Sequence, residues 1–250
     1  MDKKRNSVEF KITGRYAMFA DPVTRVGGEK FSYQIPTYQA LKGILESVYW
    51  KPTFIWYIDA VRVMKKIQTE SKGIKPIKMS GGNDLAFYTY LRDVEYQVLA
   101  HFEWNEHRRN LEGDRDEGDR NEHKHHNIAK RSIKKGGRRD VFLGTRECQG
   151  YVEPCVFDEG ESFYKDYGEL DFGVQFHGYD YPDETGNDEL VVRLWRAKMK
   201  DGLIKFLMPK DCDPSLRRFI RKMTAKKFEP NRNFSFIEND PTVADLLSEE

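Results

Sequence analysis

The order of strand-like and helix-like segments in the first 160 residues constrains the fold most. Residues 8–12 alternate apolar and polar side chains, which is typical of a half-buried strand. Residues 36–51 carry apolar side chains at helical spacing, which predicts a helix that ends before Pro52. Residues 54–63 are rich in aromatic and β-branched side chains, which indicates another strand. Its expected partners are two further strand-like stretches, at residues 85–91 and 96–104.

A second helix and two more strands complete this order. The helix is predicted from Asn127 to Lys135, where the pair Gly136 and Gly137 ends it. Further strands are predicted near residues 141–143 and 151–157. Strand, helix, two strands, helix and strand is the order of a ferredoxin-like domain.

After about Gly160 the pattern changes to longer strand-like segments. Residues 163–176 and 190–206 are expected to form antiparallel strands, joined by a turn-rich link at residues 181–186. The last segment has one capped helix start but little to bury. The sequence therefore predicts an α+β protein with a ferredoxin-like domain at residues 1–160, a smaller antiparallel β domain at residues 161–230, and a polar acidic tail at residues 231–250.

The charges are segregated along the chain, although the formal net charge of the 250 residues is only +1. Residues 120–139 hold eight basic side chains and one acid, and residues 205–232 form a second basic block. Acids gather at residues 158–171, at 180–189 and near the end of the chain. Such basic segments are expected of a nucleic-acid binder, but ordinary solvated helix faces would have the same composition.

Composition argues against several other classes. The longest dense apolar run, residues 54–58, is far shorter than the roughly 20 residues that cross a bilayer, so no membrane partner is expected and the chain is predicted to be cytoplasmic. The cysteines Cys148, Cys155 and Cys212 match neither a zinc ribbon nor a redox pair. They are predicted to be reduced thiols, and neither a metal nor a cofactor is expected.

A histidine-rich stretch follows a tandem duplication. Residues 113–117 (GDRDE) are repeated almost identically as residues 118–122 (GDRNE), which predicts an exposed, mobile loop. Directly afterwards comes the string HKHH at residues 123–126. An imidazole beside a fixed positive charge is what metal-free RNA cleavage requires. A histidine-rich metal site and a plain solvated loop remain alternative interpretations, although no acid or cysteine at ligand spacing supports zinc.

Several unusual strings occur together in this chain. They are residues 36–44 (PTYQALKGI), 46–53 (ESVYWKPT), 136–140 (GGRRD), 142–152 (FLGTRECQGYV), 181–186 (YPDETG) and 192–195 (VRLW). On these strings, the chain from about Val8 to Phe206 resembles the CRISPR-associated Cas5d family of subtype I-C. The resemblance implies an RRM-like N-terminal domain with an added C-terminal β domain, in agreement with the order of segments.

The resemblance also implies an activity in antiviral defence. It implies a metal-independent endoribonuclease that cuts the repeat stem-loops of precursor crRNA by attack of the ribose 2′-hydroxyl, leaving a 2′,3′-cyclic phosphate. It further implies that the protein stays on the 5′ handle of the mature crRNA, with the other subunits of the type I-C interference complex (Cascade). The alternatives are a non-catalytic subunit that binds the crRNA handle, and binding of double-stranded DNA by the basic blocks.

The family's catalytic set falls here on Tyr49, Lys124 and His125, with the Lys-His pair expected just before the second helix. His125 would be the general acid or base, Lys124 would stabilise charge on the phosphate, and Tyr49 would orient the 2′-hydroxyl or the phosphate. The adjacent His126 is the alternate catalytic histidine. RNA binding is expected from basic side chains on the second helix and the turn after it, namely Arg131, Lys134, Lys135, Arg138 and Arg139.

Overall fold

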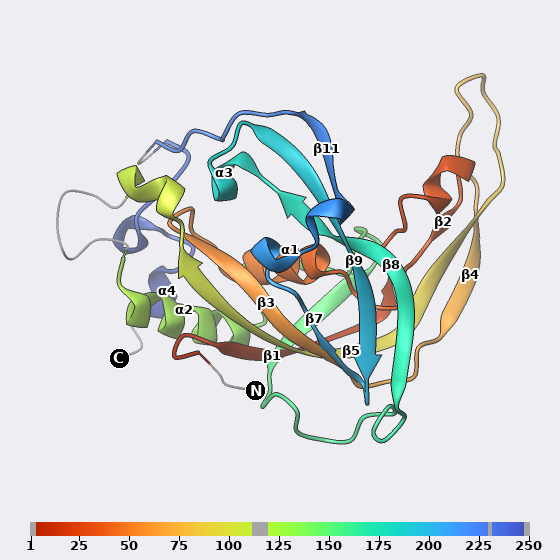
Figure 1. The fold of residues 1–250 in the computed structure, drawn as a ribbon, viewed down its shortest axis with the longest axis horizontal. Helices are drawn as coiled ribbons and strands as arrows, with labels where there is room; N and C mark the ends of the chain where they lie inside the picture. The colour runs from red at the N-terminus through yellow and green to blue at the C-terminus, as the bar shows by residue number, and fades with distance from the viewer. Residues whose placement is uncertain (1–3, 112–119, 230–231, 248–250) are drawn as a thin grey trace.

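The computed structural model describes residues 4–111, 120–229 and 232–247. In these residues eleven strands form one sheet, almost entirely antiparallel, with few helices, so the predicted α+β class is confirmed (Figure 1). The strands are β1 (Val8–Ala17), β2 (Lys30–Phe31), β3 (Phe54–Val63), β4 (Thr69–Ile74), β5 (Ala86–Trp104), β6 (Val141–Phe142), β7 (Gln149–Pro154), β8 (Glu169–Asp180), β9 (Glu189–Lys200), β10 (Leu203–Lys205) and β11 (Arg217–Lys222). The helices are α1 (Tyr38–Val48), α2 (Glu122–Lys134), α3 (Pro182–Thr185) and α4 (Ala244–Leu247), with short 3-10 turns η1 (Thr24–Gly27), η2 (Glu106–Leu111), η3 (Pro209–Asp211), η4 (Pro214–Leu216) and η5 (Ile237–Asn239).

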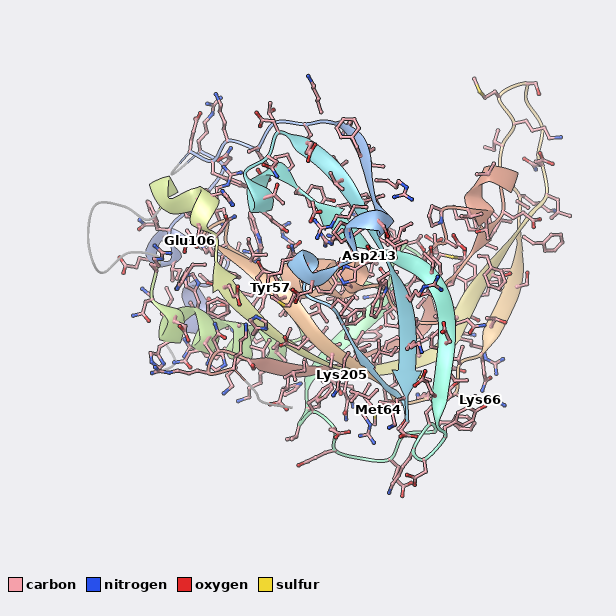
Figure 2. The ribbon with its side chains drawn as sticks, in the orientation of Figure 1. Tyr57, Met64, Lys66, Glu106, Lys205 and Asp213 are labelled. Atoms are coloured by element: carbon pink, nitrogen blue, oxygen red, sulfur yellow. The ribbon has the colours of Figure 1, made fainter. Side chains whose placement is uncertain are left out.

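The first half of the chain has ferredoxin-like connectivity. Along the chain the elements run β1, α1, β3, β5, α2 and β7, and across the sheet the strands run β3-β5-β1-β7 with every neighbouring pair antiparallel. Helix α1 packs on β3, and α2 packs on β1 and β7. In Figure 2, Tyr57 and Met64 mark the course of β3, and Lys205 of β10 lies beside it.

One long strand organises this half. Strand β5 runs without interruption through 19 residues, where the sequence predicted two separate strands. It hydrogen-bonds to β1, β2, β3 and β4. Its N-terminal end and β4 form the hairpin that projects at the upper right of Figure 1. Because β5 pairs with both β4 and β1, it connects the projecting hairpin to the strands on which α2 packs.

The second half extends the same sheet. Strands β8 and β9 are antiparallel, as predicted, and β10 links β9 to β3 through hydrogen bonds. The turn-rich link between β8 and β9 forms the short helix α3, which ends at Gly186 with φ +74°. The division into domains at residue 160 stays a prediction, since strands from both sides of it pair within one sheet.

Helix α2 begins earlier than predicted. The Asn121 side chain caps the helix by accepting a hydrogen bond from the Lys124 backbone N–H at 3.0 Å, so the helix starts at Glu122 rather than at Asn127. Lys124, His125 and His126 therefore lie on the first two turns of α2, and not in front of it as the resemblance led us to expect. The helical backbone turns these consecutive side chains toward different neighbours.

The C-terminal segment is more buried than its polar composition indicated. Ile237, Val243 and Leu246 are at most 4% exposed and belong to the main apolar core, so the expectation that this segment has little to bury is wrong. Three well-spaced apolar side chains are enough to fix a polar segment to the core. Figure 1 shows α4 lying beside α2.

The tandem duplication lies mostly outside the described residues. The prediction that it forms a mobile loop therefore concerns residues that are not described. No helix in the described ranges is long and apolar enough to span a bilayer.

Candidate active site

Tyr49 is held rigidly at the end of α1. It is the C-terminal cap of the helix, and its backbone N–H donates to the Leu45 carbonyl at 2.9 Å. Its own carbonyl accepts a hydrogen bond of 2.7 Å from the indole nitrogen of Trp56 on β3. Both backbone groups are therefore satisfied, and the phenol ring is fixed between α1 and the sheet, fully buried.

His125 meets Tyr49 from the first turn of α2. Its Nδ1 lies 2.7 Å from the Tyr49 hydroxyl, although the two residues are 76 positions apart in sequence. The imidazole is fully buried and sits among the rings of Phe54, Phe102 and Trp104, with centroids 5.1, 6.2 and 5.5 Å away. These rings come from β3 and β5, so the centre of the sheet fixes the imidazole against the tyrosine.

Lys124 does not join this pair. Its ammonium lies 3.1 Å from a carboxylate oxygen of Glu238, in the C-terminal segment, and its side chain is 29% exposed. Of the three residues of the predicted catalytic set, the structure brings Tyr49 and His125 into contact and directs Lys124 toward the C-terminal segment.

His126, the alternate histidine, faces another side of α2. Its Nε2 donates to the Ser7 carbonyl at 2.9 Å, just before β1. Burial, together with nearby Lys130, lowers the pKa of His126. The hydrogen bond to Tyr49 thus favours His125 as the working histidine.

The basic residues predicted to bind RNA lie on α2 and the turn after it. Lys134 and Arg139 are exposed, and Arg131 is half-buried on the same face of α2 as Lys124 and Lys135. Arg138 is tied to α1 by a hydrogen bond of 3.2 Å from its backbone N–H to the Val48 carbonyl. The predicted set therefore reaches from α2 to the end of α1, close to Tyr49.

A groove of about 620 Å³ opens between the end of α1, the turn after α2 and the C-terminal segment. Sequence reasoning missed Lys51 here, although it follows the Tyr49-Trp50 pair directly. The rings of Trp50 and Phe228 lie 5.8 Å apart, and the Lys226 ammonium is 5.3 Å from the Phe228 ring centre. Aromatic rings beside basic groups suit bases and phosphates respectively. The basic side chains that line the groove are Lys51, Arg138, Arg139, Lys226 and Arg232.

Two of the three thiols are poorly suited to act as nucleophiles. Burial raises the pKa of both Cys148 and Cys212, which keeps them protonated near neutral pH. In the ranges that the structure covers, no three His, Cys, Asp or Glu side chains gather as a set of metal ligands.

These features define a class: ferredoxin-like proteins that carry a basic groove beside the end of the first helix. The family is then specific. The model of the family described as CRISPR-associated protein (Cas_Cas5), of the Cas5d type, matches residues 7–207, and the chain belongs to this family.

Individual relatives agree with this assignment. Over 230 residues the chain is 28% identical to the CRISPR pre-crRNA endoribonuclease Cas5d of Mannheimia succiniciproducens, covering 80% of this chain and 94% of that protein. It is 27% identical to the protein of the same name from Thermus thermophilus, over 74% of this chain and 79% of the relative. A crystal structure described as a CRISPR-associated protein has a TM-score of 0.70 at 35% identity, covering 85% of this chain and 96% of the other.

Proposed function

We propose that this protein is a metal-independent endoribonuclease that cuts the repeat stem-loops of precursor crRNA and then stays bound to the crRNA in the type I-C interference complex. The observation that carries the proposal is the hydrogen bond between the Tyr49 hydroxyl and His125 Nδ1 beside a basic groove. The two curated relatives are named for cleavage of pre-crRNA, which supports the same substrate class.

The reaction needs a proton acceptor, a proton donor and a stabiliser of negative charge. The ribose 2′-oxygen attacks the adjacent phosphorus while its proton passes to a base, the bond from phosphorus to the 5′-oxygen breaks, and that oxygen takes up a proton. The products are a 2′,3′-cyclic phosphate and a 5′-hydroxyl. In this proposal His125 exchanges one of these protons, and Tyr49 orients the imidazole and the reacting groups.

The basic groups would stabilise the substrate and the transition state. Negative charge grows on the non-bridging phosphate oxygens during attack, and a nearby ammonium or guanidinium lowers the barrier. Lys124 is adjacent to His125 in sequence, and Arg138 packs on the end of α1. The exposed Lys134 and Arg139 suit the backbone of the stem, which is contacted mainly through phosphates and 2′-hydroxyls.

One observation favours a rival function. Tyr49 and His125 are both completely buried, so RNA cannot touch them in the conformation described here. A subunit that only binds the crRNA handle would need no such access. The rival predicts that the purified protein binds repeat RNA and never cuts it.

The deciding experiment incubates purified protein with repeat RNA in EDTA and maps the ends of the products. We expect cleavage at the 3′ base of the stem with a cyclic phosphate end, and none when the attacking 2′-hydroxyl is replaced by hydrogen. His125→Ala should lower the cleavage rate by about 10²–10⁴-fold, the range typical of a lost general acid or base. The matched His126→Ala variant should cut within a few-fold of wild type. Cleavage that needs added metal, or that survives the 2′-deoxy substitution, contradicts the proposal.

A further inference from the structure

The C-terminal segment, residues 232–247, contacts the body of the protein with a consistent charge pattern. Apart from Arg232 at its start, which pairs with the neighbouring Glu229, the segment supplies the acid and the body the base in every ion pair described between them. The pairs are Lys51–Asp240 at 2.7 Å, Lys124–Glu238 at 3.1 Å, Lys135–Asp245 at 3.7 Å and Arg138–Asp240 at 4.0 Å.

Three of the four bases in these pairs are ones that the sequence led us to expect at the RNA. Lys124 belongs to the predicted catalytic set, and Lys135 and Arg138 belong to the predicted RNA-binding set. Lys124, Arg131 and Lys135 share one face of α2 because they are seven and four residues apart. The C-terminal segment lies along that face, because Lys124 pairs with Glu238 and Lys135 pairs with Asp245 of α4. The carboxylates of the segment thus lie where phosphates of a bound RNA would be required.

Lys51 and Asp240 form the shortest and most buried of these ion pairs. The Lys51 side chain is 3% exposed, and its ammonium also donates to the Ser235 carbonyl at 2.6 Å. Burial alone would raise the pKa of Asp240, but hydrogen bonds from Lys51 and Thr242 outweigh it and hold that pKa below its ordinary value. Asp240 is therefore a charged, hydrogen-bonded anion held in the groove, as a phosphodiester would be.

The same segment also packs against α2, the helix that carries His125. Ile237, Val243 and Leu246 lie in the apolar core that also contains Tyr49. The segment is held by these three side chains, by Phe234, which is 7% exposed, and by ion pairs, and in its described residues it has only two short helical turns, η5 and α4. In the pairs Lys124–Glu238 and Lys135–Asp245 the carboxylates are 70% and 86% exposed, so these contacts can open locally at less than the cost of global unfolding, whereas the pair Lys51–Asp240 is buried.

We propose that residues 232–247 are an intramolecular mimic of RNA: their carboxylates occupy a phosphate-binding site formed by Lys51, Lys124, Lys135 and Arg138, and substrate RNA displaces them. The inference rests on the proposed function, because it takes the phosphodiester backbone of RNA as the displacing ligand. It assigns Lys51 as a phosphate-binding residue, and it gives a route by which the buried pair of Tyr49 and His125 becomes accessible.

The test uses full-length protein and repeat RNA carrying a 2′-deoxy nucleotide at the cut site, so that binding is measured without cleavage. Glu238→Gln and Asp245→Asn each remove one exposed carboxylate of the segment and leave its apolar contacts intact. Breaking one exposed ion pair should shift the equilibrium toward the open form, so each variant should bind RNA about two- to fivefold more tightly. Glu169→Gln on β8 is the matched control, because it removes an exposed carboxylate that pairs with Lys198 at 2.8 Å and contributes nothing to the segment or the groove. It should bind like wild type.

A second measurement follows the segment directly in unmodified protein. The backbone amides of Asp240, Val243 and Leu246 form hydrogen bonds within the segment. We expect their hydrogen exchange to become faster when the 2′-deoxy RNA is added. Slower or unchanged exchange, or Glu238→Gln binding no more tightly than Glu169→Gln, overturns the mimic. A protein that binds repeat RNA without ever cutting it overturns the proposed cleavage alone, because both of these readouts depend on binding.

Discussion

Two buried histidines in this protein have similar surroundings and different chemistry. His125 and His177 are both fully buried, and each contacts a tyrosine at one end of α1, Tyr49 for the first and Tyr38 for the second. In each case the rest of the pocket is largely aromatic. The difference lies in what the ring nitrogens bind.

His177 has both ring nitrogens committed to fixed partners. Its ring stacks on Tyr38 with centroids 4.4 Å apart, its Nε2 donates to the Leu207 carbonyl at 3.0 Å, and its Nδ1 accepts from Arg193 Nε at 3.4 Å. Burial, and then the charge of Arg193, lower the pKa of His177 to about 3. Such a histidine stays neutral at physiological pH and serves the packing of β8 and β9.

His125 instead binds a hydroxyl group, which can both donate and accept a proton. It also stands on the first turn of a helix next to Lys124, whereas His177 is on strand β8 beside the buried guanidinium of Arg193. If the proposed function holds, the comparison teaches that burial does not separate a structural histidine from a reactive one. The partner of the imidazole does.

The sharpest way to break this comparison is to replace each histidine by glutamine. His125→Gln should lower the single-turnover cleavage rate by about 10²–10⁴-fold while RNA binding is kept, because a proton-transfer group is lost. His177→Gln can still donate to the Leu207 carbonyl and should cleave at the wild-type rate per folded molecule. If both variants lose cleavage equally while remaining folded, the distinction drawn between the two sites is wrong.

The next effect concerns stability and pH. An unfolded chain binds a proton on His177 below pH 6.5, the ordinary value, but the folded protein resists protonation until about pH 3. The stabilisation is therefore complete above pH 6.5 and is lost as the pH falls toward 3, at about 1.4 kcal/mol per pH unit. Urea unfolding at pH 7.5, 6.5 and 5.5 measures this slope, and His177→Gln should make it shallower. Parallel slopes for wild type and variant would contradict the assignment.

The smallest effect separates the two tyrosines. Tyr49→Phe removes the hydroxyl that holds His125 and should slow cleavage by about 2- to 12-fold, the equivalent of one hydrogen bond of about 0.5–1.5 kcal/mol. Tyr38→Phe removes a buried hydroxyl that has no well-formed hydrogen bond among the described residues. It should leave cleavage unchanged and stability unchanged or slightly higher. A loss of stability in Tyr38→Phe as large as in Tyr49→Phe would contradict this account.

Local patterns predicted much of the fold. Strand β3 has the bounds expected from its β-branched and aromatic residues, and α1 ends before Pro52 as expected. The prediction placed the start of α2 too late because the first turn of the helix is polar. The helix begins directly after the Asn121 cap, whereas its periodic apolar residues begin only in the following turn. Strand β5 was divided in two because its middle residues, around Asp93, interrupt the apolar alternation while the backbone continues.

The candidate site depended on contacts that no local pattern contains. Resemblance to a family supplied Tyr49 and His125, and the structure brings them together from the ends of two helices. Lys51 and Asp240, by contrast, are 189 positions apart and carry no motif. The C-terminal segment was interpreted as a polar acidic tail because its four buried apolar side chains, Phe234, Ile237, Val243 and Leu246, are scattered among polar residues and acids. Only the folded chain reveals what those acids neutralise.

Strand β5 has a consequence for how such a chain can change over evolution. Four strands take their register from it, over a length of about 60 Å. Inserting or deleting one residue within it would turn the following side chains to the opposite face and break several pairings at once. Changes of length are then tolerated in the connection after the strand, where the sequence already carries two copies of a five-residue block. The length of β5 is thus constrained by its four partners, and the duplicated block lies in the connection that follows it.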